Sequence, residues 1–167
     1  EHHQRYERGK TATALKVIGK AKDTGTTVTF LPDKDIFETT EFDYETIVAR
    51  LREMAFLNAG LQIEITNEKT EKHELFRYDG GVSEFVLHIN KNKTTLHPKP
   101  IYIQGEKDSV QVEIAIQYTD GYTENIFTFA NNINTLEGGT HLIGFKGALT
   151  RALNDYGRKN KLFDESF

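Results

Sequence analysis

The sequence of 167 residues contains no cysteine and no tryptophan, a single methionine and only three prolines. The lack of cysteine excludes disulfides, thiolate metal sites, cysteine nucleophiles and iron–sulfur clusters, and it fits a reducing compartment. Any chemistry of this chain must therefore use oxygen or nitrogen atoms.

Long hydrophobic runs and a strong excess of one charge are also missing. No stretch approaches the roughly 18 apolar residues that a membrane span requires, and the first residues do not resemble a signal peptide, so we expect a cytoplasmic protein with no membrane partner. The formal net charge is −4, from 21 Lys and Arg against 25 Asp and Glu. The chain as a whole therefore does not attract nucleic acid, and such a contact would need a local basic patch.

The residues that are present suit a compact globular fold. Hydrophobic residues make up 37% and charged residues 28% of the chain, which is near the average for folded domains. The length allows one domain, or one domain with a piece of another. The chain opens on an alternating polar and aromatic run at residues 4–9, without an initiator Met, and this pattern predicts a fragment that begins part-way into a strand.

Residue patterning in the first half predicts strands, then a helix, then a hairpin. Alternation favours a strand at 15–19 and β-branched residues favour one at 26–31, and Pro32-Asp33 should close the second strand. Apolar residues at helical spacing predict a helix with Asp43 as its N-cap and Gly60 beyond its end. Alternation then predicts a hairpin of residues 61–66 and 73–78.

The second half predicts a short helix, three strands and a long helix. The short helix should begin after residues 79–81 and end near Asn92. An antiparallel meander is expected from residues 101–103, 110–116 and 126–130, with Asp120-Gly121 as the strongest hairpin signal. The last helix should be capped by Thr140, end at Gly157 and face inward with Leu142, Phe145, Leu149, Ala152, Leu153 and Tyr156.

No residue type occurs in a pattern that predicts a catalytic centre. The glycine-rich run from Gly138-Gly139 to Gly144 resembles a phosphate loop, but Phe145 occupies the position of the essential lysine. We therefore expect a turn at Gly138-Gly139, and close helix packing at Gly144 and Gly147. The histidines show no paired metal-ligand spacing and are expected to lie at the surface or to form hydrogen bonds. The serines, which are Ser83, Ser109 and Ser166, lack a nucleophile-elbow context.

Basic residues lie off the apolar stripe of the last helix. Arg151, Arg158 and Lys159 are candidates for a stripe that contacts phosphates, because Lys and Arg neutralise phosphates whatever the net charge. A solvated helix face explains the same residues. The residues alone leave both interpretations open.

One resemblance rests on six runs along the chain, at residues 25–33, 50–58, 78–81, 90–93, 112–118 and 131–141. In order, these runs resemble the B subunits of bacterial type II topoisomerases, DNA gyrase and topoisomerase IV. The residues around His97-Pro98 and at 131–141 favour the gyrase branch of the family over topoisomerase IV.

This resemblance implies an α+β fold with two parts. Residues 1–35 would be the last strands of a GHKL ATPase sheet, and residues 36–167 most of a transducer domain. That domain is a mixed β-sheet with helices packed on one face and a left-handed βαβ crossover, whereas sequence alone would favour the right-handed form. The implied role is to couple ATP binding and hydrolysis to DNA strand passage in an enzyme that introduces negative supercoils.

The resemblance also implies site residues, cofactors and partners. Gly25, Thr26 and Val28 match the adenine side of the family's nucleotide site. The catalytic and Mg-binding residues would precede Glu1, and the lysine that reaches the terminal phosphate would follow Phe167. ATP and Mg are therefore expected in the full-length protein, with none bound to this segment and no turnover by it alone. The implied partners are the A subunit of gyrase, a second copy of the B subunit and double-stranded DNA, which Arg151, Arg158 and Lys159 would face.

Two other functions stay open at this point. One is a self-contained α+β module that binds a protein or nucleic acid. The other is a small hydrolase that uses the Gly138-Gly139 turn as an oxyanion site, although no base is visible near it.

Overall fold

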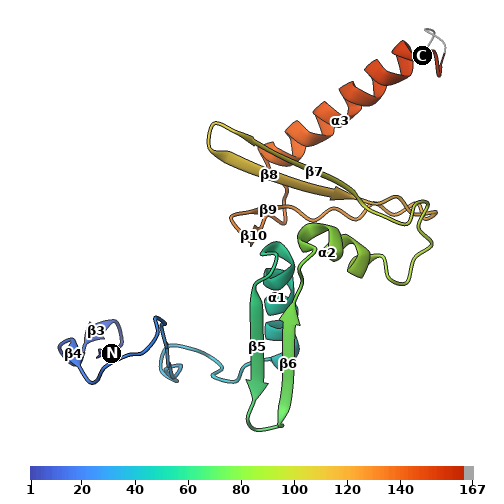
Figure 1. Ribbon diagram of the computed structural model, residues 1–167. Coiled ribbons are helices and arrows are strands. Elements are labelled where there is room, and N and C mark those ends of the chain that lie inside the picture. The colour runs from blue at the N-terminus through green and yellow to red at the C-terminus, as the bar shows by residue number, and fades with distance from the viewer. Residues whose placement is uncertain (164–167) are drawn as a thin grey trace. The chain divides into compact units, whose positions relative to one another are not determined.

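The computed structural model describes residues 1–163, and helices and strands alternate along the chain as in an α+β protein (Figure 1). The chain divides into two compact units, at Glu1–Tyr44 and from Glu45 onward. The assignment of residues 1–35 to an ATPase domain and of 36–167 to a transducer domain stays a prediction.

The first unit contains four short strands. β1 (His2–His3) pairs with β4 (Lys16–Val17), and β2 (Tyr6–Glu7) pairs with β3 (Lys10–Thr11), both antiparallel. The strand predicted at 15–19 is thus reduced to two residues, and the strand predicted at 26–31 is wrong because that segment is extended without a ladder partner. β-branched residues favour a strand only where a neighbouring strand supplies hydrogen bonds and packing.

The second unit begins with the predicted helix. α1 (Tyr44–Leu57) supplies the buried residues Val48, Ala55 and Phe56. The predicted hairpin is confirmed as β5 (Gln62–Asn67) and β6 (Lys72–Arg77), whose Phe76 completes this core. Gly60 has the positive φ (82°) expected beyond a helix end, and its N–H donates to the Tyr78 carbonyl over 3.0 Å, which brings the end of β6 to the exit of α1.

The predicted short helix is α2 (Gly81–Ile89), which ends at Asn90. Its start is fixed by Glu84, whose carboxylate accepts the Gly80 N–H at 3.0 Å. The Phe56 ring stacks on Tyr78 with centroids 3.5 Å apart and lies 5.2 Å from Phe85 of α2. One aromatic cluster therefore joins α1, the end of β6 and α2.

The meander prediction is partly wrong. β7 (Ile101–Lys107) and β8 (Val110–Ile116) form an antiparallel hairpin whose turn residues, Asp108 and Ser109, both have positive φ. The third strand does not join them, because β9 (Phe129–Ala130) turns back at once to pair with β10 (Ile133–Asn134).

The turn between β9 and β10 explains this difference. Asn131 and Asn132 adopt φ of 48° and 66°, and asparagine tolerates the left-handed conformation that two-residue hairpin turns require. Asp120-Gly121, the predicted hairpin, lies instead in a bend next to an isolated bridge between Thr95 and Thr119. The sequence therefore contained the correct hairpin signal at the Asn pair.

The last helix is α3 (Thr140–Lys159), and both of its predicted ends need correction. The N-cap is Gly139, so Thr140 is the first helical residue. Gly157 lies inside the helix, which closes later: Lys161 N–H donates to the Arg158 carbonyl at 3.1 Å and Leu162 N–H to the Gly157 carbonyl at 2.9 Å. This pair of bonds is a Schellman motif, with Lys161 at φ 52° in the position that glycine usually takes.

Only the first half of the predicted apolar stripe on α3 is covered. Leu142, Phe145 and Leu149 are half-buried, whereas Leu153 is 55% and Tyr156 62% exposed, and Ala152 is exposed too. A Cβ added at Gly144 or Gly147 would meet no atom within 4 Å, so the predicted close packing at these glycines is wrong.

All strand pairs among residues 1–163 are antiparallel and form two-stranded sheets. The mixed sheet and the left-handed crossover stay predictions. Within the described part of the chain, no helix combines the length and hydropathy needed to cross a bilayer.

Candidate functional site

The segment that resembles part of an adenine pocket is open. Gly25, Thr26 and Val28 lie in the extended stretch without secondary structure; all three are exposed, Val28 by 78%. A hydroxyl and an apolar side chain in this order suit the edge and face of a purine base, but they supply no group for a phosphate. The fit to a nucleotide is thus limited to its base.

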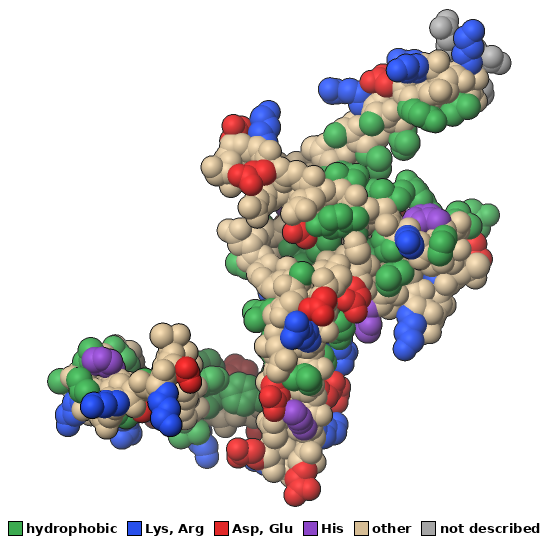
Figure 2. Space-filling view, in the orientation of Figure 1, with side chains coloured by type: hydrophobic (Ala, Val, Ile, Leu, Met, Phe, Trp, Pro, Cys, Tyr) green, Lys and Arg blue, Asp and Glu red, His purple; other side chains and the backbone are tan. Residues whose placement is uncertain are grey.

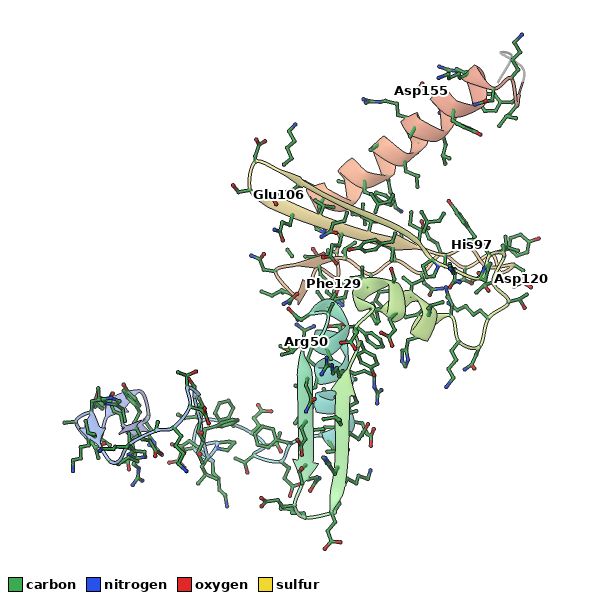
Figure 3. All side chains as sticks on the ribbon, viewed as in Figure 1. Arg50, His97, Glu106, Asp120, Phe129 and Asp155 are labelled. Carbon is green, nitrogen blue, oxygen red and sulfur yellow. The ribbon has the colours of Figure 1, made fainter. Side chains whose placement is uncertain are left out.

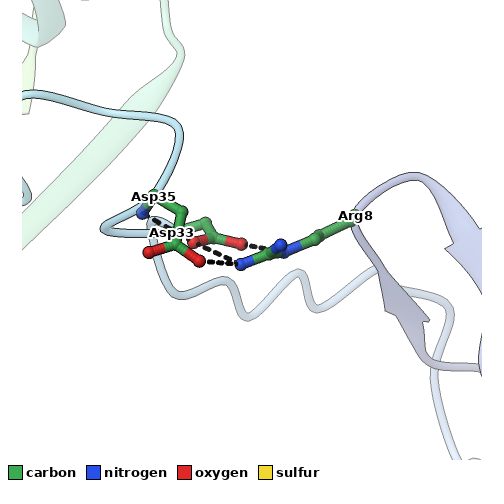
Figure 4. Close-up of polar contacts among 3 residues, drawn as sticks. All are labelled: Arg8, Asp33 and Asp35. Carbon is green, nitrogen blue, oxygen red and sulfur yellow. Dashed lines mark hydrogen bonds and ion pairs between the residues drawn. The ribbon is translucent and has the colours of Figure 1, made fainter.

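The first unit is tied together just after this segment. The Arg8 guanidinium donates to Asp33 at 2.5 and 3.1 Å and to Asp35 at 2.5 Å (Figure 4). The Asp35 N–H, donating to the Asp33 carboxylate at 2.9 Å, is the largest cause of a lowered Asp33 pKa, and Arg8 adds to it. The two carboxylates raise the pKa of Arg8 in turn. This cluster fixes the turn that follows Pro32.

Metal-binding chemistry has no support within residues 1–163. No group of three or more His, Asp or Glu side chains gathers there in a way that could hold an ion. The described histidines that have polar partners form hydrogen bonds or ion pairs, as predicted: His73 with Glu64 at 3.1 Å, His97 with the Lys99 carbonyl at 2.7 Å, and His141 with Thr135 at 3.3 Å.

His97 joins the linker before β7 to the chain after β8 (Figure 3). Its Nδ1 faces a carbonyl and must donate, so Nε2 is free to accept the Tyr118 N–H at 3.0 Å. Gln117 donates to the His97 carbonyl at 3.0 Å, and the buried Asn90 donates to Gln117 at 3.1 Å. These bonds join the end of α2, the linker before β7 and the chain after β8. They also leave His97 no free nitrogen for catalysis.

The Gly138-Gly139 turn offers little to support a phosphate loop or an oxyanion site. The Gly138 N–H donates to the Thr135 carbonyl at 2.8 Å, so it is already engaged. A Cβ at Gly139 would lie 2.8 Å from the His141 ring, and φ is 77° at Gly138 and 154° at Gly139. The glycines serve the turn, as predicted. Of the three serines, Ser166 lies outside the described residues.

Some of the basic residues of α3 lie on one face of the helix. A shallow hollow along the helix is lined by Lys146, Arg151, Asp155 and Arg158, with Thr150 and Asn154 between them. Arg151 and Arg158 are about two turns apart and therefore on the same face. Lys159 follows Arg158 by about 100° of rotation and is not among the residues lining this hollow. Figure 2 shows basic side chains on one edge of α3 and hydrophobic ones along the opposite edge.

Sequence reasoning missed a polar contact between α1 and the β9–β10 turn. Asn132 donates its side-chain amide to the Asn58 side-chain oxygen at 2.9 Å, and Arg50 donates to the Asn132 carbonyl at 2.7 Å. Figure 3 places Arg50 near Phe129 of β9. The Asn131-Asn132 pair signals a turn, but no pattern in the sequence indicates that this turn contacts Asn58.

Comparison with known proteins gives one consistent result. The family model described as DNA gyrase B matches residues 81–166. The chain is 57% identical over 167 residues to the DNA gyrase B subunit of Halalkalibacterium halodurans, and 55% identical over 157 residues to that of Clostridium acetobutylicum, covering 99% and 93% of the chain. It spans only 26% and 25% of the length of these two curated relatives.

A solved structure agrees with the sequence comparison. The 43K ATPase domain of Thermus thermophilus gyrase B, determined in complex with an aminocoumarin, is 42% identical with a TM-score of 0.85. The match covers 99% of this chain and 46% of that one. Both units of the chain are therefore similar to parts of one known protein.

Proposed function

Because the chain belongs to the DNA gyrase B family, we propose that it is a segment of the B subunit of an ATP-dependent type II DNA topoisomerase that introduces negative supercoils. The observation that carries this proposal is the similarity over 99% of the chain at 57% identity. Within that protein the segment couples ATP binding and hydrolysis to DNA strand passage.

In the proposed coupling role, this chain transmits conformational change and does not itself catalyse the hydrolysis of ATP. Gly25, Thr26 and Val28 contact the base of ATP, while groups outside this chain bind Mg and the phosphates and carry out hydrolysis. The exposed adenine-side contacts of these three residues cannot offset the entropy lost on binding, so the chain alone neither holds ATP usefully nor turns it over. In the finer fold that we propose, the strands of the second unit belong to a mixed sheet with a left-handed crossover.

The proposed partners follow from the same role. They are the A subunit of gyrase, a second B subunit brought together by ATP, and double-stranded DNA. The basic face of α3 supports the last of these, since Arg151 and Arg158 line one hollow with Lys146 and can neutralise phosphates there. Lys159 extends the charge toward the C-terminal end of the helix.

The experiment that tests the DNA contact replaces Arg151, Arg158 and Lys159 with Ala in the full-length B protein. With the gyrase A protein and plasmid DNA, we expect weaker DNA stimulation of ATPase activity, slower supercoiling and a smaller salt dependence, while ATPase activity without DNA is retained. Unchanged supercoiling and unchanged DNA-stimulated ATPase would refute this contact.

A B-type subunit of topoisomerase IV is the second candidate, supported by the resemblance of the same residue runs to both branches of the family. The product of the reaction separates the two. A gyrase B protein, combined with its A protein, must drive relaxed plasmid to negative superhelicity with ATP, whereas the topoisomerase IV counterpart must not. A stand-alone interaction module would support neither reaction.

A further inference from the structure

The turn between β9 and β10 is bound to α1 by side-chain amides in one defined orientation. Asn58 Nδ2 donates to the Met54 carbonyl at 2.7 Å, and a carbonyl can only accept. Asn58 Oδ1 must therefore face Asn132, whose Nδ2 donates to it at 2.9 Å. Arg50 adds a bond to the Asn132 carbonyl at 2.7 Å. We name Arg50, Asn58 and Asn132 the α1 latch.

The same hairpin is continuous with the start of α3. Beyond β10, Thr135 N–H donates to the Thr128 carbonyl at 2.8 Å, and the Thr128 hydroxyl donates to the Thr135 carbonyl at 3.0 Å. The Thr135 hydroxyl lies 3.3 Å from His141 Nε2 in the first turn of α3. An unbroken series of polar contacts thus runs from α1 through the hairpin to α3.

The link between the hairpin and α3 ends in two adjacent glycines, Gly138 and Gly139. Gly138 and Gly139 adopt φ of 77° and 154°, and a Cβ at these positions would lie 3.0 Å from Leu142 and 2.8 Å from His141. Two adjacent glycines in such conformations can absorb a large change in backbone angles. Rotation there re-aims α3 as a rigid rod, because the helix itself is continuous from Thr140 to Lys159.

Apolar packing holds the hairpin without fixing its direction. Phe85 of α2 contacts Phe127 and Phe129 with ring centroids 5.7 and 6.3 Å apart. Such contacts tolerate sliding, whereas the α1 latch joins named donors to named acceptors. Loss of the α1 latch should therefore leave the β9–β10 hairpin packed on Phe85, but its orientation relative to α1 would no longer be fixed.

We propose that Asn58 and Asn132 are positioning residues that transmit movement of α1 through the β9–β10 hairpin to the Gly138-Gly139 hinge, and so set the direction of α3. This inference rests on the proposed coupling function. In this scheme the Gly138-Gly139 hinge has two backbone conformations. One occurs when the Asn58–Asn132 hydrogen bond is formed and the other when it is broken. Neither asparagine touches nucleotide or DNA in this scheme.

The test is made in the full-length B protein with the gyrase A protein, measuring superhelical turns introduced per ATP hydrolysed. Asn132→Gly removes the side-chain amide and keeps the left-handed backbone, since glycine adopts positive φ freely. Asn131→Gly is the matched control, because Asn131 has φ 48° in the same turn and takes no part in the bond to Asn58. Asn58→Ala removes the acceptor from the α1 side.

Loss of one hydrogen bond corresponds to a change of roughly three- to tenfold, so we expect Asn132→Gly and Asn58→Ala each to lower the number of turns per ATP by about that factor. The ATPase rate without DNA should be retained, and the melting temperature should fall by no more than the loss of one hydrogen bond allows. The double variant should be no worse than either single one, because both remove the same contact. Asn58→Asp, which keeps an acceptor, should restore part of the loss.

Three results would overturn the inference. These are an unchanged ratio in both Asn132→Gly and Asn58→Ala, an equal loss in Asn131→Gly, or additive losses in the double variant. If one variant does not fold, the other still decides the outcome through its ratio. If the unmutated protein introduces no supercoils at all, the proposed function itself is wrong. That failure differs from a failure of this inference, because the number of superhelical turns per ATP is then zero before any substitution is made.

Discussion

The ring of Phe56 stacks on that of Tyr78, with centroids 3.5 Å apart and planes inclined by 13°. Phe56 is the largest side chain among residues 1–163 that is fully buried, at 1% exposure. It comes from the last turn of α1, and Tyr78 follows β6 directly before α2. This stack is the point at which the helix, the hairpin and the second helix of the larger unit meet.

Phe56→Ala should therefore destabilise the larger unit severely. Removing a buried Phe costs about 3–5 kcal/mol, from lost transfer energy and the cavity left behind. Denaturant unfolding of the full-length protein, followed by a probe in this region, measures the change. Tyr122→Ala is the control, since Tyr122 is fully exposed and its loss should change stability by about 0.5 kcal/mol or less. Equal effects of the two substitutions would contradict this view of the core.

The C-terminal cap of α3 offers a stabilising change. Lys161 holds φ 52° as the left-handed residue of the Schellman motif. Lys161→Gly should stabilise the helix end by about 0.5–1 kcal/mol, because glycine adopts this conformation without steric cost. Lys159→Gly, two residues earlier and at the last position of the helix, should destabilise the helix end instead, by less than the roughly 1 kcal/mol that glycine costs inside a helix. Amide exchange in the last turn distinguishes the two directions, and a loss of protection in Lys161→Gly would refute the cap.

The Arg8 cluster predicts a dependence on pH in the acid range. The folded-state pKa of Asp33 is lowered, first by the Asp35 N–H and then by Arg8. Its carboxylate therefore adds stability above the unfolded pKa of about 3.9, and this contribution is lost as the pH falls through the lower folded pKa.

A titration of the Asp33 carboxyl carbon by NMR should give a midpoint below that of an ordinary aspartate. Arg8→Ala should move the midpoint upward only in part, because the larger contribution, from the backbone N–H, remains. A midpoint that returns fully to the ordinary value would show that the Asp35 bond is not formed in solution.

His97 should matter through its hydrogen bonds alone. His97→Ala removes the partner of the Tyr118 N–H and of the Lys99 carbonyl; because both bonds are exposed to solvent, each should contribute only the net value of an ordinary hydrogen bond, about 0.5–1.5 kcal/mol. The measurement is hydrogen exchange at the Tyr118 amide, which should lose protection. His73→Ala is the comparison, since its partner Glu64 is exposed at the surface and such a pair contributes about 1 kcal/mol or less.

The periodic spacing of apolar residues predicted the helices and strands that bury one face strongly. α1 was predicted from the helical spacing of residues such as Val48 and Ala55, and α2 from that of Phe85 and its neighbours. The β5–β6 hairpin was predicted from alternation along residues 61–66. The deeply buried Phe56 and Phe76 were not part of these patterns. The N-terminal strands were over-predicted, since the β-branched run at 26–31 has no neighbouring strand within the described residues. The Asp120-Gly121 hairpin failed because a turn signal has no effect unless strands on both sides are in register.

The candidate site was less predictable than the fold. Helical spacing put Arg151 and Arg158 on one face of α3, and in the structure the two side chains line one hollow. The Asn58–Asn132 contact joins residues 74 positions apart, and no local pattern reports on such a pair. The half-exposed stripe of α3 was likewise unforeseen, because spacing shows which residues share a face and not how much of that face is covered.

Supercoiling by a chimera is the sharpest test of the coupling role of this chain. In the gyrase B subunit of Halalkalibacterium halodurans, which is 57% identical over 167 residues, the matching stretch is replaced by this chain and the product is combined with the gyrase A protein. We predict that the chimera introduces negative supercoils into relaxed plasmid in an ATP-dependent manner. A folded chimera that hydrolyses ATP yet leaves the plasmid relaxed would contradict the claim that this chain couples the two events.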